Sequence, residues 1–114
     1  MRTIIAGGRD FTDLALASKY LDALDPQPTV VLNGCARGAD TLGAFWASSR
    51  HIPIEPYPAN WTLYGKGAGF RRNTEMAASA DRLVAFWNRH SKGTAHMIDT
   101  ANKMGLVVEV IHVS

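Results

Sequence analysis

Glycines and cationic side chains occur together in two short segments that suit phosphate binding. The first is Gly7-Gly8-Arg9, and the second is Ser91-Lys92-Gly93-Thr94. Glycine lets backbone N–H groups approach an anion, and arginine offers a fork of donors. Neither segment completes a dinucleotide-binding or P-loop motif, and two glycines after a strand are often only a turn. Ser91 and Thr94 also suit a simple helix cap.

A third glycine-rich segment, residues 34–40, stands at the start of a predicted helix. Helix N-terminal amides beside Gly34 and Gly38 favour an anion. Asp40 has two interpretations, because it suits either a ligand contact or stabilisation of the first helical turn. Cys35 is the single cysteine, so no intrachain disulfide can form. No sequence feature supplies it with a base, and we expect it to be inert.

The segment that follows residue 56 combines aromatic and basic side chains. It contains Trp61, Tyr64 and Lys66. The helix predicted after it contributes Arg71, Arg72 and Asn73. The predicted loop runs over residues 56–69. A loop of more than about a dozen residues in a compact domain is usually functional. Aromatic faces can stack on a base while the cations meet phosphate. The alternative is that Trp61 and Tyr64 cap the hydrophobic core.

Apolar segments of strand length alternate with helix-like segments along the chain. Strands are expected over residues 3–6, 29–32, 52–55, 82–86 and 106–111. Helices are expected around residues 14–24, 42–47, 68–80 and 97–104. This order predicts one α/β domain over residues 1–114, a three-layer Rossmann-like fold. Its five-stranded sheet is mainly parallel, with helices on both faces.

The glycine-rich, aromatic and basic segments all follow predicted strands. The turns from helix to strand are short and ordinary by comparison. In a parallel sheet, the carboxyl ends of the strands meet at one edge, where open α/β folds bind ligands. We therefore expect the four segments to form one site.

Charge and composition exclude several classes of function. The 114 residues carry 12 Lys and Arg against 10 Asp and Glu, a formal charge of +2. This surplus is too small to capture nucleic acid by charge alone. No segment approaches the roughly 18 apolar residues that a membrane span needs, and no signal peptide is evident, so we expect a cytoplasmic protein. The four histidines lack ligand spacing, and neither a metal site nor a cofactor is expected.

Taken together, the motifs resemble the YspA-like family of the SLOG superfamily. SLOG domains are Rossmann-like and are named for DprA/Smf and the Lonely-Guy phosphoribohydrolases. The matching pieces are Gly-Gly-Arg-x-Phe at 7–11, Gly-Ala-Asp at 38–40, Asn60-Trp61 with Tyr64-Gly65, Arg71-Arg72-Asn73 with Met76, and Ser91 to Thr94. The resemblance implies a nucleotide or nucleotide-derived small molecule as ligand, which is sensed or processed. It also implies pairing with a second copy, although the sequence marks no interface for it.

The motifs and this resemblance together predict a set of ligand-binding residues at the carboxyl edge. They are Gly7, Gly8, Arg9, Gly34, Gly38, Asp40, Trp61, Tyr64, Lys66, Arg71, Arg72, Asn73, Ser91, Lys92, Gly93 and Thr94. No membrane partner is expected.

Catalysis is an alternative to simple binding. Lonely-Guy enzymes hydrolyse the N-glycosidic bond of a nucleoside monophosphate with an arginine in R-x-x-x-M and a glutamate in P-G-G-x-G-T-x-x-E. Arg72 with Met76 fits the first motif, but the glutamate position falls on Met97. A glycosidase needs a carboxylate near the sugar, which Asp10, Asp40 or Glu75 could supply from another segment. Of these, Asp40 is the candidate we pair with Arg72. The second alternative, single-stranded nucleic-acid binding as in DprA, is not favoured because the cations form no long stripe.

Overall fold

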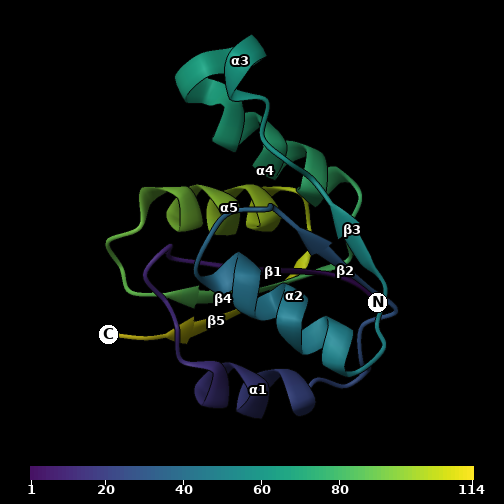
Figure 1. The fold of residues 1–114 in the computed structure, drawn as a ribbon. Coiled ribbons are helices and arrows are strands. Elements are labelled where there is room, and N and C mark those ends of the chain that lie inside the picture. The colour runs from purple at the N-terminus through teal and green to yellow at the C-terminus, as the bar shows by residue number, and fades with distance from the viewer.

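The computed structural model describes residues 1–114 and shows a five-stranded parallel sheet between two layers of helices (Figure 1). Its strands are β1 (Arg2–Gly7), β2 (Val30–Asn33), β3 (Ile54–Pro56), β4 (Arg82–Trp87) and β5 (Val107–His112). They lie in the order β3-β2-β1-β4-β5, and every neighbouring pair is parallel. The predicted three-layer Rossmann-like fold is confirmed.

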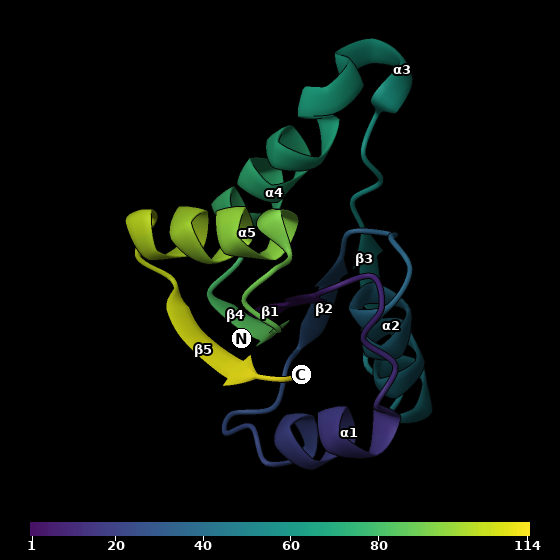
Figure 2. The same ribbon diagram turned by 90° about the vertical axis from the view of Figure 1, so that its left-hand side faces the viewer.

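The helices cover both faces of this sheet. They are α1 (Leu14–Asp22), α2 (Ala39–Ser49), α3 (Trp61–Tyr64), the short 3-10 helix η1 (Gly65–Gly67), α4 (Ala68–Ala78) and α5 (Lys92–Lys103). Helices α1 and α2 lie on one face, and α4 and α5 lie on the other (Figures 1 and 2). The chain therefore winds in both directions from β1, which places a topological switch point beside this strand.

Two hydrophobic cores are built from alternate residues of the same strands. In β1, Ile5 packs in the cluster that contains Trp46 of α2, whereas Ile4 packs in the cluster that contains Met97 of α5. All four side chains are at most 1% exposed. Successive side chains of a strand point to opposite faces, so a central strand covered on both sides must be apolar throughout.

The structure corrects two of the expected elements. The predicted long loop contains α3 and η1, whereas α2 starts at Ala39, within the glycine-rich segment where its start was expected. The Asn60 side chain caps α3 by accepting a hydrogen bond from the Leu63 N–H at 3.0 Å. Strand β3 starts at Ile54, because the N–H of Ile52 still bonds to the Ala47 carbonyl at the end of α2.

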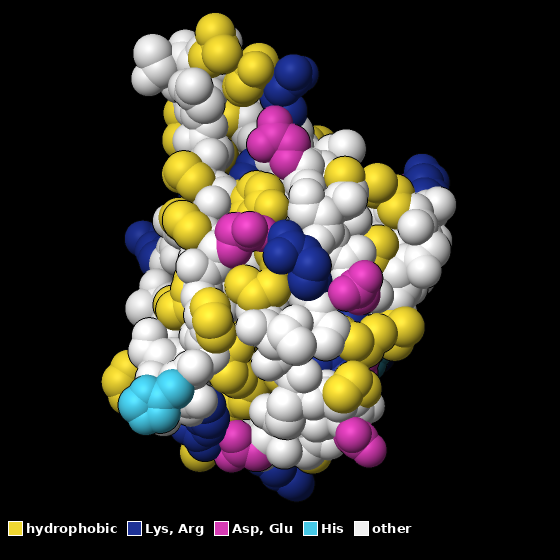
Figure 3. Space-filling model, turned by 90° about the vertical axis from the view of Figure 1, so that its right-hand side faces the viewer, with side chains coloured by type: hydrophobic (Ala, Val, Ile, Leu, Met, Phe, Trp, Pro, Cys, Tyr) yellow, Lys and Arg dark blue, Asp and Glu magenta, His cyan; other side chains and the backbone are white.

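Helix α3 and the start of α4 project beyond the sheet (Figures 1 and 2). No residue of α3 is buried, and Trp61, Leu63 and Tyr64 are 55%, 66% and 40% exposed. Hydrophobic side chains lie at this projecting end in the space-filling view (Figure 3). No helix of the chain is long and apolar enough to span a membrane.

Arginines stabilise the amino edge of the sheet, where β1 and β4 begin. Arg82 is 3% exposed, and its guanidinium donates to the Thr3 hydroxyl at 2.9 and 3.1 Å and to the Pro26 carbonyl at 2.9 Å. Arg2 pairs with the Glu55 carboxylate and donates to the Ser79 carbonyl at 2.6 Å. These bonds join β1, β3, β4 and the turn before β2.

Candidate anion-binding cleft

A cleft of about 1200 Å³ opens at the carboxyl edge of the sheet. The segments after β1, β2, β3 and β4 all contribute to its walls. Most of the predicted ligand-binding residues line it: Gly7, Gly8, Arg9, Gly34, Asp40, Trp61, Arg72, Asn73, Ser91, Lys92, Gly93 and Thr94. The structure thus brings residues from all four segments into one concave surface.

Three predicted residues on the projecting segment, Tyr64, Lys66 and Arg71, do not line the cleft. The Arg71 guanidinium lies 4.1 Å from the centre of the Tyr64 ring, and its Nε is 4.0 Å from Glu75 Oε1. The alternative that Trp61 and Tyr64 cap the core is wrong, because both are exposed.

Gly38, which also does not line the cleft, supports the cleft from behind. It has a φ of 76°, and a Cβ there would lie 2.3 Å from the Arg9 carbonyl oxygen. The next residue, Ala39, donates its N–H to the Gly8 carbonyl at 3.2 Å. Only glycine tolerates this approach, which fixes the first loop against the start of α2.

The loop after β2 is held together by Asn33, which is buried at the end of the strand. Its side-chain nitrogen donates to the Asp40 carbonyl at 2.7 Å, and its side-chain oxygen accepts from the Cys35 N–H at 2.8 Å. Cys35 adopts a φ of 62° and is exposed in the cleft wall. This network gives the loop one defined shape.

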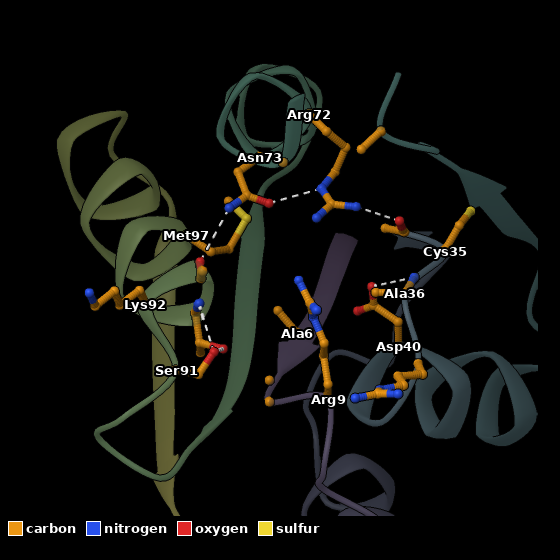
Figure 4. A pocket seen from close by; sticks show the side chains of 18 of the residues that line it. Ala6, Arg9, Cys35, Ala36, Asp40, Arg72, Asn73, Ser91, Lys92 and Met97 are labelled. Carbon is orange, nitrogen blue, oxygen red and sulfur yellow. Dashed lines mark hydrogen bonds between the residues drawn. The ribbon is translucent and has the colours of Figure 1, made fainter. Parts of the chain in front are cut away.

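Asp40 places a nearly buried carboxylate in the wall of the cleft, with the residue 8% exposed. Its Oδ2 accepts a hydrogen bond from the Ala36 N–H at 3.1 Å. Burial raises the pKa of Asp40 to about 6, although the Ala36 hydrogen bond and the Arg72 charge both act to lower it. The second oxygen, Oδ1, has no hydrogen-bond partner and faces the open space beside Arg9 (Figure 4).

Arg72 and Asn73 connect the two walls of the cleft (Figure 4). Arg72 donates through Nη1 to the Gly34 carbonyl and through Nε to Asn73 Oδ1 at 3.0 Å. Asn73 donates to the Gly93 carbonyl at 3.2 Å. A Cβ on Gly34 would lie 2.7 Å from both Arg72 Nη1 and Asp40 Oδ2, so a side chain there would displace this arrangement.

The start of α5 forms the opposite wall. Ser91 caps the helix, because its Oγ accepts from the Thr94 N–H at 3.3 Å and lies 2.8 Å from the Thr94 hydroxyl. The capping interpretation is therefore confirmed for Ser91, whereas Thr94 supplies the N–H that is capped. The N–H groups of Lys92 and Gly93 have no acceptor in the protein. Free amides at a helix start attract anions.

Four cations line the cleft without any carboxylate partner: Arg9, Arg37, Arg72 and Lys92. Figure 4 shows Arg9 extending through the middle of the cleft and Lys92 pointing away from it on the α5 side. The acidic groups in the lining are Asp10 and Asp40. The cleft is therefore positive, although the whole chain is nearly neutral.

Sequence reasoning missed several lining residues, among them Arg37, Asn88 and His90. Arg37 stands between the glycines of the second segment, which was the signal available. Asn88 shapes the loop after β4, because its Oδ1 accepts from the N–H groups of His90 and Ser91 at 2.8 and 2.9 Å. Asn-led turns of this kind give no distinct ligand-binding signal in a sequence.

Aromatic side chains occupy the wall of the cleft that belongs to α3 and α4. Trp61 and Phe70 both line it, and a Cβ on Gly69 would lie 3.4 Å from the Trp61 indole. The Phe70 ring stacks on His96 with centroids 3.9 Å apart and an interplanar angle of 2°. Burial lowers the pKa of His96, so its ring is mainly uncharged at neutral pH. The cleft thus combines a cationic part with an aromatic part.

Known proteins are similar to this chain in sequence and in fold. The sequence model of the YspA, cpYpsA-related SLOG family matches residues 1–64. The Gene 61 protein of Mycobacterium phage D29 is 37% identical over 116 residues, covering 94% of this chain and 93% of that protein.

Among solved structures, DNA processing protein A (DprA) from Streptococcus pneumoniae has the same fold. It superposes with a TM-score of 0.82 at 16% identity and covers 99% of this chain. The chain spans 50% of the DprA chain. The phage relative, the family match and the shared Rossmann-like architecture lead to one assignment: this chain belongs to the YspA, cpYpsA-related SLOG family.

Proposed function

We propose that the cleft binds a nucleotide or a nucleotide-derived small molecule. The observation that carries the proposal is that Arg9, Arg37 and Arg72 line one cleft and that none of them forms an ion pair. Keeping like charges close together is unfavourable unless a counter-anion joins them. Phosphate matches the guanidinium fork and the free amides at the start of α5.

The aromatic wall supports a nucleotide over a simple phosphate ester. Trp61 is 55% exposed and Phe70 is 48% exposed, and both lie on the cleft wall. A base stacked on an exposed aromatic ring removes apolar surface from water. In this proposal, Arg9, Gly93 and the first loop bind the phosphate end, and Trp61 contacts the base.

Hydrolysis of the bound nucleotide is the second candidate function. It is favoured by Asp40, because a carboxyl group with a pKa of about 6 in a cleft suits general acid–base catalysis. The helix position expected to carry glutamate holds Met97, which is 1% exposed and has no ionisable group. Binding without efficient hydrolysis is therefore the leading proposal.

The primary test is identification of the ligand and of the residue that holds it. Native mass spectrometry of the purified protein, followed by denaturation, identifies any nucleotide carried from cells. Calorimetric titration with AMP, GMP, CMP and UMP then compares the wild type with Arg9→Ala. Arg9 makes no hydrogen bond or ion pair within the protein, so the variant should fold normally and bind about 10-fold or more weakly.

Lys103→Ala is the matched control, because it removes one positive charge at the other end of α5, where Lys103 pairs with Asp99. Its affinity should equal that of the wild type. Chromatography of the ligand after long incubation detects released base, which would support the hydrolase. Failure of all four nucleotides to bind, together with steeply salt-dependent oligonucleotide binding, would overturn the proposal in favour of nucleic-acid binding.

A further inference from the structure

Asp40 is an unusual residue for a cleft that attracts anions. The residue is only 8% exposed, and the cleft that it lines also contains Arg9, Arg37 and Arg72, none of which forms an ion pair. One oxygen is satisfied by the Ala36 N–H, whereas Oδ1 has no donor in the protein and opens onto the cleft. A carboxylate oxygen in this position is a strong hydrogen-bond acceptor that a ligand can use.

The chemistry of this oxygen restricts what the ligand presents to it. A phosphate dianion has no hydrogen to donate and would be repelled, so the phosphate lies elsewhere in the cleft. An ammonium group would be opposed by the surrounding Arg9, Arg37 and Arg72. An uncharged donor that lies next to a phosphate in the same molecule satisfies both conditions, and a sugar hydroxyl is such a donor.

The position of Asp40 separates it from the wall suited to a base. Asp40 belongs to the first turn of α2, beside the glycine loops. The aromatic side chains Trp61 and Phe70 belong to α3 and α4. A nucleotide with its base on the aromatic wall and its phosphate near Arg9 therefore presents its ribose, and not a base amino group, to Asp40.

The carboxylate is also held in a fixed position. Asn33 anchors the backbone of Asp40 at 2.7 Å, and Ala36 anchors the side chain at 3.1 Å. Gly34 leaves room for both Asp40 and Arg72, because any Cβ there would lie 2.7 Å from each. An acceptor that cannot rotate away discriminates strongly between a ligand that donates and one that does not.

We propose that Asp40 Oδ1 accepts a hydrogen bond from a ribose hydroxyl of the bound ligand, so that the cleft selects ribose phosphates over deoxyribose phosphates and over phosphate alone. This inference rests on the proposed nucleotide-binding function. It adds a specificity that neither the cations nor the aromatic wall provides, because both treat ribose and deoxyribose alike.

The test measures the affinity of each ribonucleoside monophosphate against its 2′-deoxy and 3′-deoxy counterparts, with inorganic phosphate as a further probe. In the wild type, at least one deoxy compound should bind about 10-fold or more weakly than the ribonucleotide. Asp40→Asn preserves the shape of the side chain and the Ala36 hydrogen bond, but turns an N–H₂ group toward the cleft. This variant should reduce the preference to about threefold or less.

Asp10→Asn is the matched control, because Asp10 is the other acidic residue of the lining and is exposed. Loss of its negative charge should increase the affinity for all the nucleotides by the same factor and leave the ribose preference unchanged. Equal binding of ribose and deoxyribose nucleotides by the wild type, or a preference that survives in Asp40→Asn, overturns the inference while nucleotide binding stands. Failure of every nucleotide to bind overturns both proposals.

Discussion

Arginine has opposite surroundings at the two edges of the sheet. At the amino edge, Arg82 and Arg2 are held by hydroxyl, carbonyl and carboxylate groups of the protein. At the carboxyl edge, Arg9 and Arg37 have no hydrogen bond or ion pair within the chain. The same residue type therefore stabilises the fold where the protein supplies acceptors, and remains available to a ligand where it does not.

The largest effect is expected from Arg82→Ala at the amino edge. The substitution leaves the buried Thr3 hydroxyl without its Arg82 donors and the Pro26 carbonyl without its donor. We expect the free energy of unfolding to fall by about 3 kcal/mol in chemical denaturation. Arg9→Ala should change it by less than about 0.5 kcal/mol. Equal destabilisation by the two variants would abolish the distinction between the edges.

A somewhat smaller effect, of opposite sign, is expected from Asp40→Asn at the carboxyl edge. The folded pKa of about 6 lies above the ordinary aspartate pKa of 3.8, so folding favours the protonated form. The wild type then loses stability from this group as pH rises from about 4 to about 6. The variant should be more stable by about 2–3 kcal/mol at pH 8, as an upper bound, and the gain should vanish near pH 4.

Denaturation of both proteins across this pH range provides the measurement. If Asp40→Asn remained more stable than the wild type at low pH, the destabilisation caused by Asp40 would not come from its charge. If the gain follows the expected profile, the ionised carboxylate is a group that the fold tolerates at the expense of stability. Such groups are typical of functional sites.

The smallest effects on stability are expected from two glycines of the cleft. Gly34→Ala forces Arg72 or Asp40 to move and should destabilise the protein by about 1–3 kcal/mol. Gly93→Ala meets nothing within 4 Å, so its stability should change by less than about 1 kcal/mol. Thermal unfolding measures both, and titration with AMP should show weakened binding for both variants. Unchanged affinity in Gly93→Ala would indicate that the ligand does not approach this part of α5.

The fold could be predicted from the sequence because the residue patterns that identify its strands and helices are local. Ile4 and Ile5 are adjacent apolar residues in a short segment, and this pattern already predicts a strand covered on both faces. The position of the cleft could also be predicted, because the strand ends of a parallel sheet share one edge. The overlooked helix α3 depends on one Asn60 side chain, and such a cap does not distinguish a four-residue helix from a turn.

The roles of individual glycines could not be predicted, because they depend on contacts between distant segments. Gly7 occurs in a motif that suggests phosphate binding, yet a Cβ there would lie 2.5 Å from the Phe86 carbonyl oxygen. Packing of β1 against β4 therefore requires a glycine at this position, whatever the ligand. Gly38 is required for the same reason, because a Cβ there would collide with the backbone of Arg9. Neither partner lies nearby in the sequence.

The projecting segment of α3 and the start of α4 has a consequence for how this protein family can diversify. No side chain of α3 is buried, so substitutions there change the folded core very little. The loop after β2 is more constrained, because a Cβ on Gly34 would meet Arg72 and a Cβ on Gly38 would meet the backbone of Arg9. Substitutions can therefore alter the aromatic wall more readily than the loop that contains Gly34 and Gly38. The aromatic wall can then differ between relatives without any change to the sheet.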